Sequence, residues 1–151
     1  ERKKEMLATI TYFENHLCAL SLKKKEINNI ENLKNKILII NTGYTSESYI
    51  ISEALSEKIL KLKSVPDALI ALNLEQGDAF ITSYASILHF LKTQEAENFN
   101  FFKLPRSNNQ ESVSFLINKN NPELLEKINN VIKELLIDGT IDNLIKKWNL
   151  I

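Results

Sequence analysis

The sequence predicts an α/β protein with a mainly parallel sheet, and two observations lead to this prediction. Short apolar runs typical of buried strands alternate with stretches in which apolar residues recur at helical spacing. The distances between them match βαβ units, in which a helix connects two parallel strands. A composition of 44% hydrophobic and 25% charged residues is that of a globular protein.

The strands and helices between residues 37 and 104 alternate in order. The expected strands are residues 37–41, 59–63, 78–82 and 99–104. A polar loop at 42–48 precedes the first helix. The second helix begins at Ser64, with Pro66 in the first turn where a missing N–H costs nothing, and runs to Gly77. The third begins at Thr82 or Ser83 and carries Ile87, Leu88 and Leu91.

The two ends of the chain have a different pattern. Residues 17–24 and 113–118 are extended segments that flank the alternating block. A long amphipathic helix follows a cap at Asn121, and Gly139 is expected to end it. Thr140 is the expected cap of a last helix, in which Trp148 packs.

Length, charge and cysteine content exclude several classes of protein. A chain of 151 residues and 17.4 kDa forms one domain or two small lobes. Nineteen basic and nineteen acidic residues give no net field, so no nucleic-acid partner is expected. The single cysteine, Cys18, builds neither an internal disulfide nor a thiolate zinc site, and no metal or cofactor is expected. No apolar run approaches the roughly 20 residues that span a bilayer.

Five short motifs occur in the order and spacing of a known family. They are ERKK at residues 1–4, NLKNKILI at 32–39, TGYTSESY at 42–49, LEQGDAFI at 74–81, and the segment 129–148 with DGT and KKW. Together they resemble the bacterial extracellular solute-binding proteins of family 3, the receptors of amino-acid ABC transporters. The resemblance implies a type II periplasmic-binding-protein-like fold, in which two α/β lobes close on a ligand.

The resemblance also implies a division of the chain. Residues 22–111 are expected to form a complete lobe 2, and residues 1–21 with 112–151 part of lobe 1. The crossings between the lobes are expected at the two extended segments. Because the resemblance covers only the later, larger part of a family member, the chain is expected to be a fragment. An incomplete lobe 1 is expected to favour association or domain swapping through its exposed edge.

The resemblance assigns the ligand carboxylate to an arginine and a turn. Arg2 matches the family's arginine clamp, whose guanidinium pairs with a carboxylate bidentately; the alternative is a solvated basic patch at a chain end. The turn lies between a strand and a helix, where backbone N–H groups bind anions; the alternative is helix capping by one of its hydroxyls. The residues of the turn are Gly43, Tyr44, Thr45 and Ser46.

The ends of two strands supply the remaining candidate ligand residues. Asn41 ends the first strand and is expected to contact a ligand side chain, since ligands bind at the carboxyl ends of strands in open α/β sheets. Thr82 and Ser83 end the third. Many amino-acid binders carry an acid at the position of Ser83 to pair with the ligand ammonium. Either another acid serves here, or the ligand is not a standard α-amino acid, or the site has decayed.

The resemblance therefore implies the substrate-binding component of an ABC importer, not an enzyme. It would bind a small polar metabolite, an amino acid or related carboxylate, in the cleft between two lobes and pass it to a membrane permease. The expected location is periplasmic or extracellular, with a lipid anchor, the signal segment lying outside this chain. The alternatives are the ligand-sensing domain of a signalling receptor and a dehydratase-type enzyme on the same fold.

Overall fold

The computed structural model describes residues 6–105 and 111–150, and the chain divides into two compact units. Unit 2 is the continuous stretch 16–111, and unit 1 combines residues 1–15 with 112–151. From the sequence, residues 16–21 are expected to belong with the N-terminal segment. The structure places them in unit 2, because they enter its sheet. That the two units correspond to the two lobes stays a prediction.

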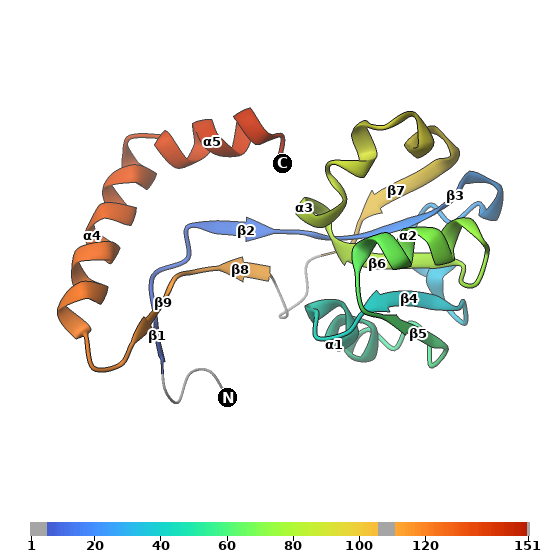
Figure 1. Cartoon of the computed structure of the whole chain (residues 1–151), viewed down its shortest axis with the longest axis horizontal. Coiled ribbons are helices and arrows are strands. Elements are labelled where there is room, and N and C mark those ends of the chain that lie inside the picture. The colour runs from blue at the N-terminus through green and yellow to red at the C-terminus, as the bar shows by residue number, and fades with distance from the viewer. Residues whose placement is uncertain (1–5, 106–110, 151) are drawn as a thin grey trace. The chain divides into compact units, whose positions relative to one another are not determined.

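Unit 2 is built on a five-stranded sheet with the strand order β5-β4-β6-β3-β7 (Figure 1). The strands are β3 (Leu17–Leu22), β4 (Leu38–Asn41), β5 (Ile59–Leu62), β6 (Ala79–Ser83) and β7 (Phe99–Lys103). The expected α/β class is confirmed. The expectation of a mainly parallel sheet holds for strand direction, because β4, β5, β6 and β7 run the same way, but β3 lies antiparallel between β6 and β7, which the sequence did not predict.

Residues 17–24 were expected to cross between the lobes, but residues 17–22 form β3, which lies inside the sheet of unit 2. All six residues of β3 are buried, so the segment is a core strand of unit 2. Its alternate side chains enter different cores: Ala19 packs on one face of the sheet, and Leu20 packs on the other. A strand that is buried on both faces has a continuous apolar sequence, and this sequence does not indicate which strands it pairs with.

Helices cover both faces of this sheet. On one face α1 (Thr45–Ser52) buries Tyr49 and Ile50, and on the other α2 (Val65–Asn73) buries Ala68 and Leu72. Shorter helical segments complete the unit. They are η2 (Lys23–Lys25), η3 (Ile30–Leu33), α3 (Tyr84–Ile87), η4 (Phe90–Lys92) and η5 (Gln94–Asn98). The third expected helix is therefore shorter than predicted and continues as 3₁₀ turns.

The residues predicted to begin and end the helices of unit 2 agree with the structure in part. Ser64 caps α2 as predicted, its hydroxyl accepting a hydrogen bond from the Asp67 N–H at 3.2 Å. Gly77 lies beyond the end of α2, where an added Cβ would lie 2.6 Å from Ile39 Cγ1, so only glycine fits this turn without a shift. The polar loop before α1 is shorter than expected, because the helix already begins at Thr45.

Unit 1 contains two short strand pairs and two helices. β1 (Met6–Ala8) pairs with β9 (Leu116–Asn118), and β2 (Phe13–Asn15) pairs with β8 (Glu111–Val113). The helices are α4 (Pro122–Ile137) and α5 (Thr140–Trp148). Asn121 caps α4 as predicted, while the cap of α5 is Gly139 in the left-handed region, rather than Thr140. Within the described residues, no helix is both long and apolar enough to cross a bilayer.

A charged cluster fixes the turn between α2 and β6. Asp78 accepts hydrogen bonds from the Ile37 N–H at 2.9 Å and from Lys25 Nζ at 3.2 Å. Lys25 also pairs with Glu75, and Glu75 pairs with Lys24. Partial burial acts to raise the pKa of Asp78, but the Ile37 N–H and Lys25 outweigh it and hold the pKa below its ordinary value.

This lowered pKa predicts a loss of stability in acid. The folded state holds the ionised form of Asp78, so its contribution is present above the ordinary pKa and lost as the pH falls through the lowered one. In Asp78→Asn the free energy of unfolding should fall less steeply as the pH drops below about 4. Urea denaturation across this range tests the effect, with Asp67→Asn as the matched control. Equal acid slopes for Asp78→Asn and the parent would contradict the prediction.

Candidate functional site

The candidate site lies at the carboxyl ends of β4 and β6 in unit 2. Leu38 pairs with Ala79 and Ile39 with Phe80, so the same register continued places Asn41 beside Thr82. The helix α1 starts four residues after β4 and contacts both strands. The structure thus brings one group of predicted residues to a single edge: Asn41, Gly43, Tyr44, Thr45, Ser46, Thr82 and Ser83. Arg2 lies outside the described residues.

The turn into α1 is held by backbone hydrogen bonds. Gly43 has a φ of +83°, in the left-handed region that favours glycine. The Thr42 N–H donates to the Leu62 carbonyl at 2.9 Å, and the Tyr44 N–H donates to the Asn41 carbonyl at 3.3 Å. At the start of α1, Thr45 is exposed and Ser46, the next residue, is buried.

Helix capping does not account for two side chains of the turn. The N-cap residue is Tyr44, and its side chain makes no capping hydrogen bond. Ser46 is only 1% exposed, yet its Oγ has no hydrogen-bond partner among the described residues, so the capping alternative is wrong for this serine. Helix N-termini attract anions through their N–H groups and dipole. The first turn of α1 is therefore suited to a carboxylate.

Two more buried oxygens lie at the strand ends. Asn41 is fully buried; its Nδ2 donates to the Leu62 carbonyl at 3.4 Å, while its Oδ1 has no partner among the described residues. Thr82 is also fully buried, and its Oγ1 is likewise without a partner there. Buried polar atoms are nearly always hydrogen-bonded, so such oxygens point to a ligand or an ordered water.

The helix α1 is anchored at its middle. The Tyr49 hydroxyl donates to the Pro105 carbonyl at 3.1 Å, which ties the helix to the segment after β7. Burial raises the pKa of Tyr49 to about 12, so the hydroxyl stays protonated and keeps this bond at physiological pH. The first turn of α1 is thereby fixed relative to the sheet.

Two residues outside the predicted set, Tyr84 and Lys103, also lie at this edge. Tyr84, which follows Ser83, is 6% exposed, and Lys103, which ends β7, lies with its Nζ 5.6 Å from the centre of the Tyr84 ring. Their positions depend on the order of the strands, because β3 lies between β6 and β7. The only sequence signal was that Lys103 falls near the end of an expected strand.

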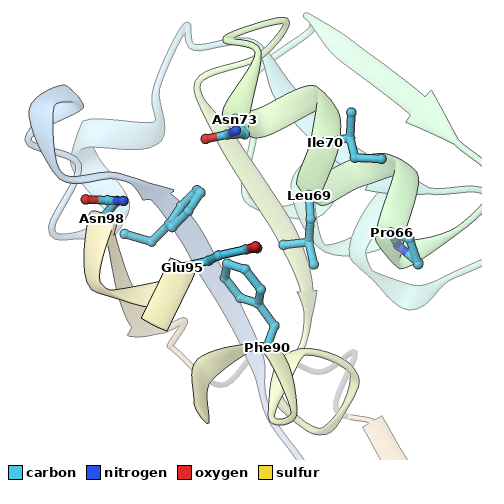
Figure 2. Close-up of a pocket in the computed structure, with 8 residues that line it drawn as sticks. Pro66, Leu69, Ile70, Asn73, Phe90, Glu95 and Asn98 are labelled. Carbon is cyan, nitrogen blue, oxygen red and sulfur yellow. The ribbon is translucent and has the colours of Figure 1, made fainter. Parts of the chain in front are cut away.

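A separate hollow lies beside α2 in unit 2 and contains none of the predicted residues. It measures about 430 Å³ and is lined by Leu69, Phe90 and Phe99, with the Glu95 side chain pointing into it and the side chains of Asn73 and Asn98 beside it (Figure 2). The described residues contain no group of three or more His, Cys, Asp and Glu side chains arranged to hold a metal ion. The predicted site is thus built from hydroxyls, an amide and backbone N–H groups.

Because the Thr82 Oγ1 has no hydrogen-bond partner among the described residues, removing it should not lower the free energy of unfolding. Thr82→Val keeps the shape of the side chain and removes the Oγ1, so the free energy of unfolding should stay unchanged or rise. The control is Ser21→Ala: Ser21 is also buried, but its Oγ donates to the Ile27 carbonyl at 3.3 Å, and its loss should cost about 1 kcal/mol. Chemical denaturation measures both. A loss of about 1 kcal/mol or more in Thr82→Val would contradict an unpartnered hydroxyl.

Comparison with known proteins identifies the family to which this chain is similar. The sequence profile of the bacterial extracellular solute-binding proteins, family 3, matches residues 1–151. The ABC transporter glutamine-binding protein GlnH of Bacillus subtilis is 31% identical over 98% of the chain, and the amino-acid-binding protein AabA of Dichelobacter nodosus is 30% identical over 93%. The chain spans 53% and 56% of these two relatives.

A solved structure agrees with the fold. An ancestral arginine-binding protein bound to glutamine is 30% identical, with a TM-score of 0.77 over 97% of this chain and 65% of its own. The expected periplasmic-binding-protein-like fold is therefore confirmed for the part that the chain covers. The ligand-binding roles of the individual residues stay predictions.

Proposed function

The chain belongs to family 3 of the bacterial extracellular solute-binding proteins, and we propose that it binds an amino acid or related carboxylate for delivery to an ABC importer. The members of the family are solute-binding proteins rather than enzymes. We extend this to the present chain, whose site needs no bond-making or bond-breaking step. Its partner is the membrane permease of the importer, and its location is periplasmic or extracellular, with a lipid anchor holding it at the membrane.

The first turn of α1 is the observation that carries this proposal. Its N–H groups and the exposed Thr45 offer donors to a carboxylate, and the helix dipole favours negative charge there. Beside it lie the buried oxygens of Asn41, Ser46 and Thr82, which have no partner among the described residues. We assign the carboxylate of the ligand to this turn, with Arg2 as a second carboxylate ligand.

The relatives support the class of ligand. GlnH is a glutamine-binding protein, AabA is an amino-acid-binding protein, and the ancestral protein was solved with glutamine bound. Every amino acid has a carboxylate, so each of these names and titles implies a ligand with a carboxylate. Because Ser83 offers a hydroxyl rather than a carboxylate, the ammonium of a standard amino acid needs a different partner here.

Binding to this turn predicts that Thr45→Ala weakens affinity. Loss of a hydrogen bond to a charged group costs about 1.5–3 kcal/mol, so the Kd should rise roughly tenfold or more. Isothermal titration with amino acids and small carboxylates measures it, and Ser48→Ala, an exposed change on the same helix, is the control. A change in stability without a change in Kd would show that Thr45 only supports the helix. Absence of binding by every amino acid and carboxylate in the panel would contradict the proposed function.

We also propose that unit 1 associates through an apolar face on α4 and α5. This face is defined by Leu124 and Val131 on one side of α4 and by Leu144 and Trp148 on one side of α5, which are 40–59% exposed. The helix α4 carries a stripe of apolar residues, yet only Ile132 is buried along it. A 16-residue amphipathic helix that buries one residue is unusual, because helices gain most of their stability by burying such a stripe.

Association through this face should be visible in solution. Val131→Lys places a charge within the face and should shift the protein toward monomer, because burying an unpaired charge is costly. Sedimentation velocity at rising protein concentration measures the shift, and Asn130→Lys, a neighbouring exposed position on α4, is the control. A parent protein that stays monomeric at high concentration contradicts this part of the proposal.

A further inference from the structure

We propose that the hollow beside α2 is a second binding site, which takes a small organic amine with an apolar body. The hollow contains none of the residues of the candidate site at the ends of β4 and β6, so this inference goes beyond the proposed function and does not rest on it. Three observations carry it: an apolar lining of suitable size, an aromatic pair fixed within that lining, and a carboxylate that points into the hollow without an ion pair.

The hollow has the size and the lining of a site for a small molecule. Its volume of about 430 Å³ lies within the range of roughly 300–1,000 Å³ that is typical of ligand pockets. Its apolar lining comes from three elements of unit 2: Leu69 and Ile70 belong to α2, Phe90 to η4 and Phe99 to β7. Ile70 is 58% exposed, so an apolar ligand that covers it removes hydrophobic surface from water, which favours binding.

The aromatic part of this lining is fixed by contacts within the protein. The rings of Phe90 and Phe99 meet edge to face, with their centres 5.3 Å apart and their planes at 78°, which is a favourable geometry for an aromatic pair. The Phe90 carbonyl accepts hydrogen bonds from the Thr93 N–H at 2.9 Å and from the Thr93 hydroxyl at 2.8 Å, and these bonds hold the turn of η4. A lining that is already ordered binds a ligand without the entropic cost of fixing its side chains.

Glu95 supplies the charge of the hollow. Its side chain points into the hollow from η5, and among the described residues that line the hollow it alone is charged (Figure 2). In the described part of the chain, Glu95 forms no ion pair and no side-chain hydrogen bond. The amide side chains of Asn73 and Asn98 lie beside it and add neutral hydrogen-bonding groups. The hollow therefore combines an apolar lining with one unpaired negative charge.

An amine with an apolar body matches this arrangement better than an alcohol or an acid of the same shape. Its ammonium donates a charge-assisted hydrogen bond to the Glu95 carboxylate, which is stronger than the bond from a neutral hydroxyl. Aromatic rings also attract a cation. A carboxylate in the hollow faces the like charge of Glu95, which disfavours it. Because a free α-amino acid carries a carboxylate on the carbon next to its ammonium, the class of solute proposed for the candidate site should bind poorly here.

The test compares three ligands that share a phenyl body and differ in the polar group: phenethylamine, 2-phenylethanol and 3-phenylpropionate. In an NMR titration that follows the backbone amide shifts at neutral pH, phenethylamine should bind saturably and shift the amides of α2 and of residues 90–99. The alcohol and the acid should bind roughly fivefold or more weakly, because neither forms an ion pair with Glu95.

A pair of variants identifies the charge that is responsible. Glu95→Gln should raise the Kd for phenethylamine roughly fivefold or more, a loss between those typical of exposed and of buried charged pairs, and should leave the Kd for 2-phenylethanol unchanged. The matched control is Glu97→Gln, which removes the same charge from an exposed position of η5 that does not line the hollow.

Several results would overturn the inference. They are a lack of saturable binding by phenethylamine, equal affinities for phenethylamine and 2-phenylethanol, and an equal rise of the Kd in Glu95→Gln and Glu97→Gln. Shifts centred on residues 43–46 would also overturn it, because the amine would then bind at the candidate site. These results leave the proposed function in place, since that function is tested separately by titration with amino acids and small carboxylates.

Discussion

The parallel pairing of β4 with β6 is the constraint on which the candidate site depends. Two neighbouring parallel strands end at the same edge, so the residues that follow them meet there although they are about forty positions apart in sequence. Gly77 permits this pairing, since a side chain at that position would collide with Ile39 of β4. The packing of a single turn thus determines where the hydroxyls and amide of the site are placed.

Local signals explain which parts of the fold could be predicted. The strands β4, β5, β6 and β7, the starts of α2 and α4, and the end of α4 follow from apolar runs and capping residues that act within a few positions, whereas α2 ends at Asn73, four residues before the predicted stop at Gly77. The role of residues 17–22 could not be predicted in this way. A six-residue apolar run is compatible with a crossing segment and with a central strand, and only long-range pairing decides between them.

Prediction of the candidate site from the sequence is limited in the same way, because local signals do not reveal long-range contacts. The turn 43–46 was predicted because glycine and hydroxyl residues between a strand and a helix have a local meaning. Tyr84 and Lys103 were missed because their proximity arises from an antiparallel strand inserted between β6 and β7. The burial of the Asn41 and Thr82 oxygens was equally invisible, since burial depends on the helices that cover the sheet. Residue type and local order predicted which residues meet at this edge of the sheet but not which of their oxygens are buried.

The continuity of unit 2 has a consequence for the order of folding. Residues 16–111 form one uninterrupted segment, whereas β1 and β9 of unit 1 must pair across more than a hundred intervening residues, as Met6 does with Asn118. Closing so long a loop in an unfolded chain is entropically costly. Once unit 2 has formed, the Leu104 N–H is bonded to the Leu17 carbonyl, and the two flanking segments emerge close together. Unit 2 then acts as an intramolecular template that lowers the kinetic barrier to assembling unit 1.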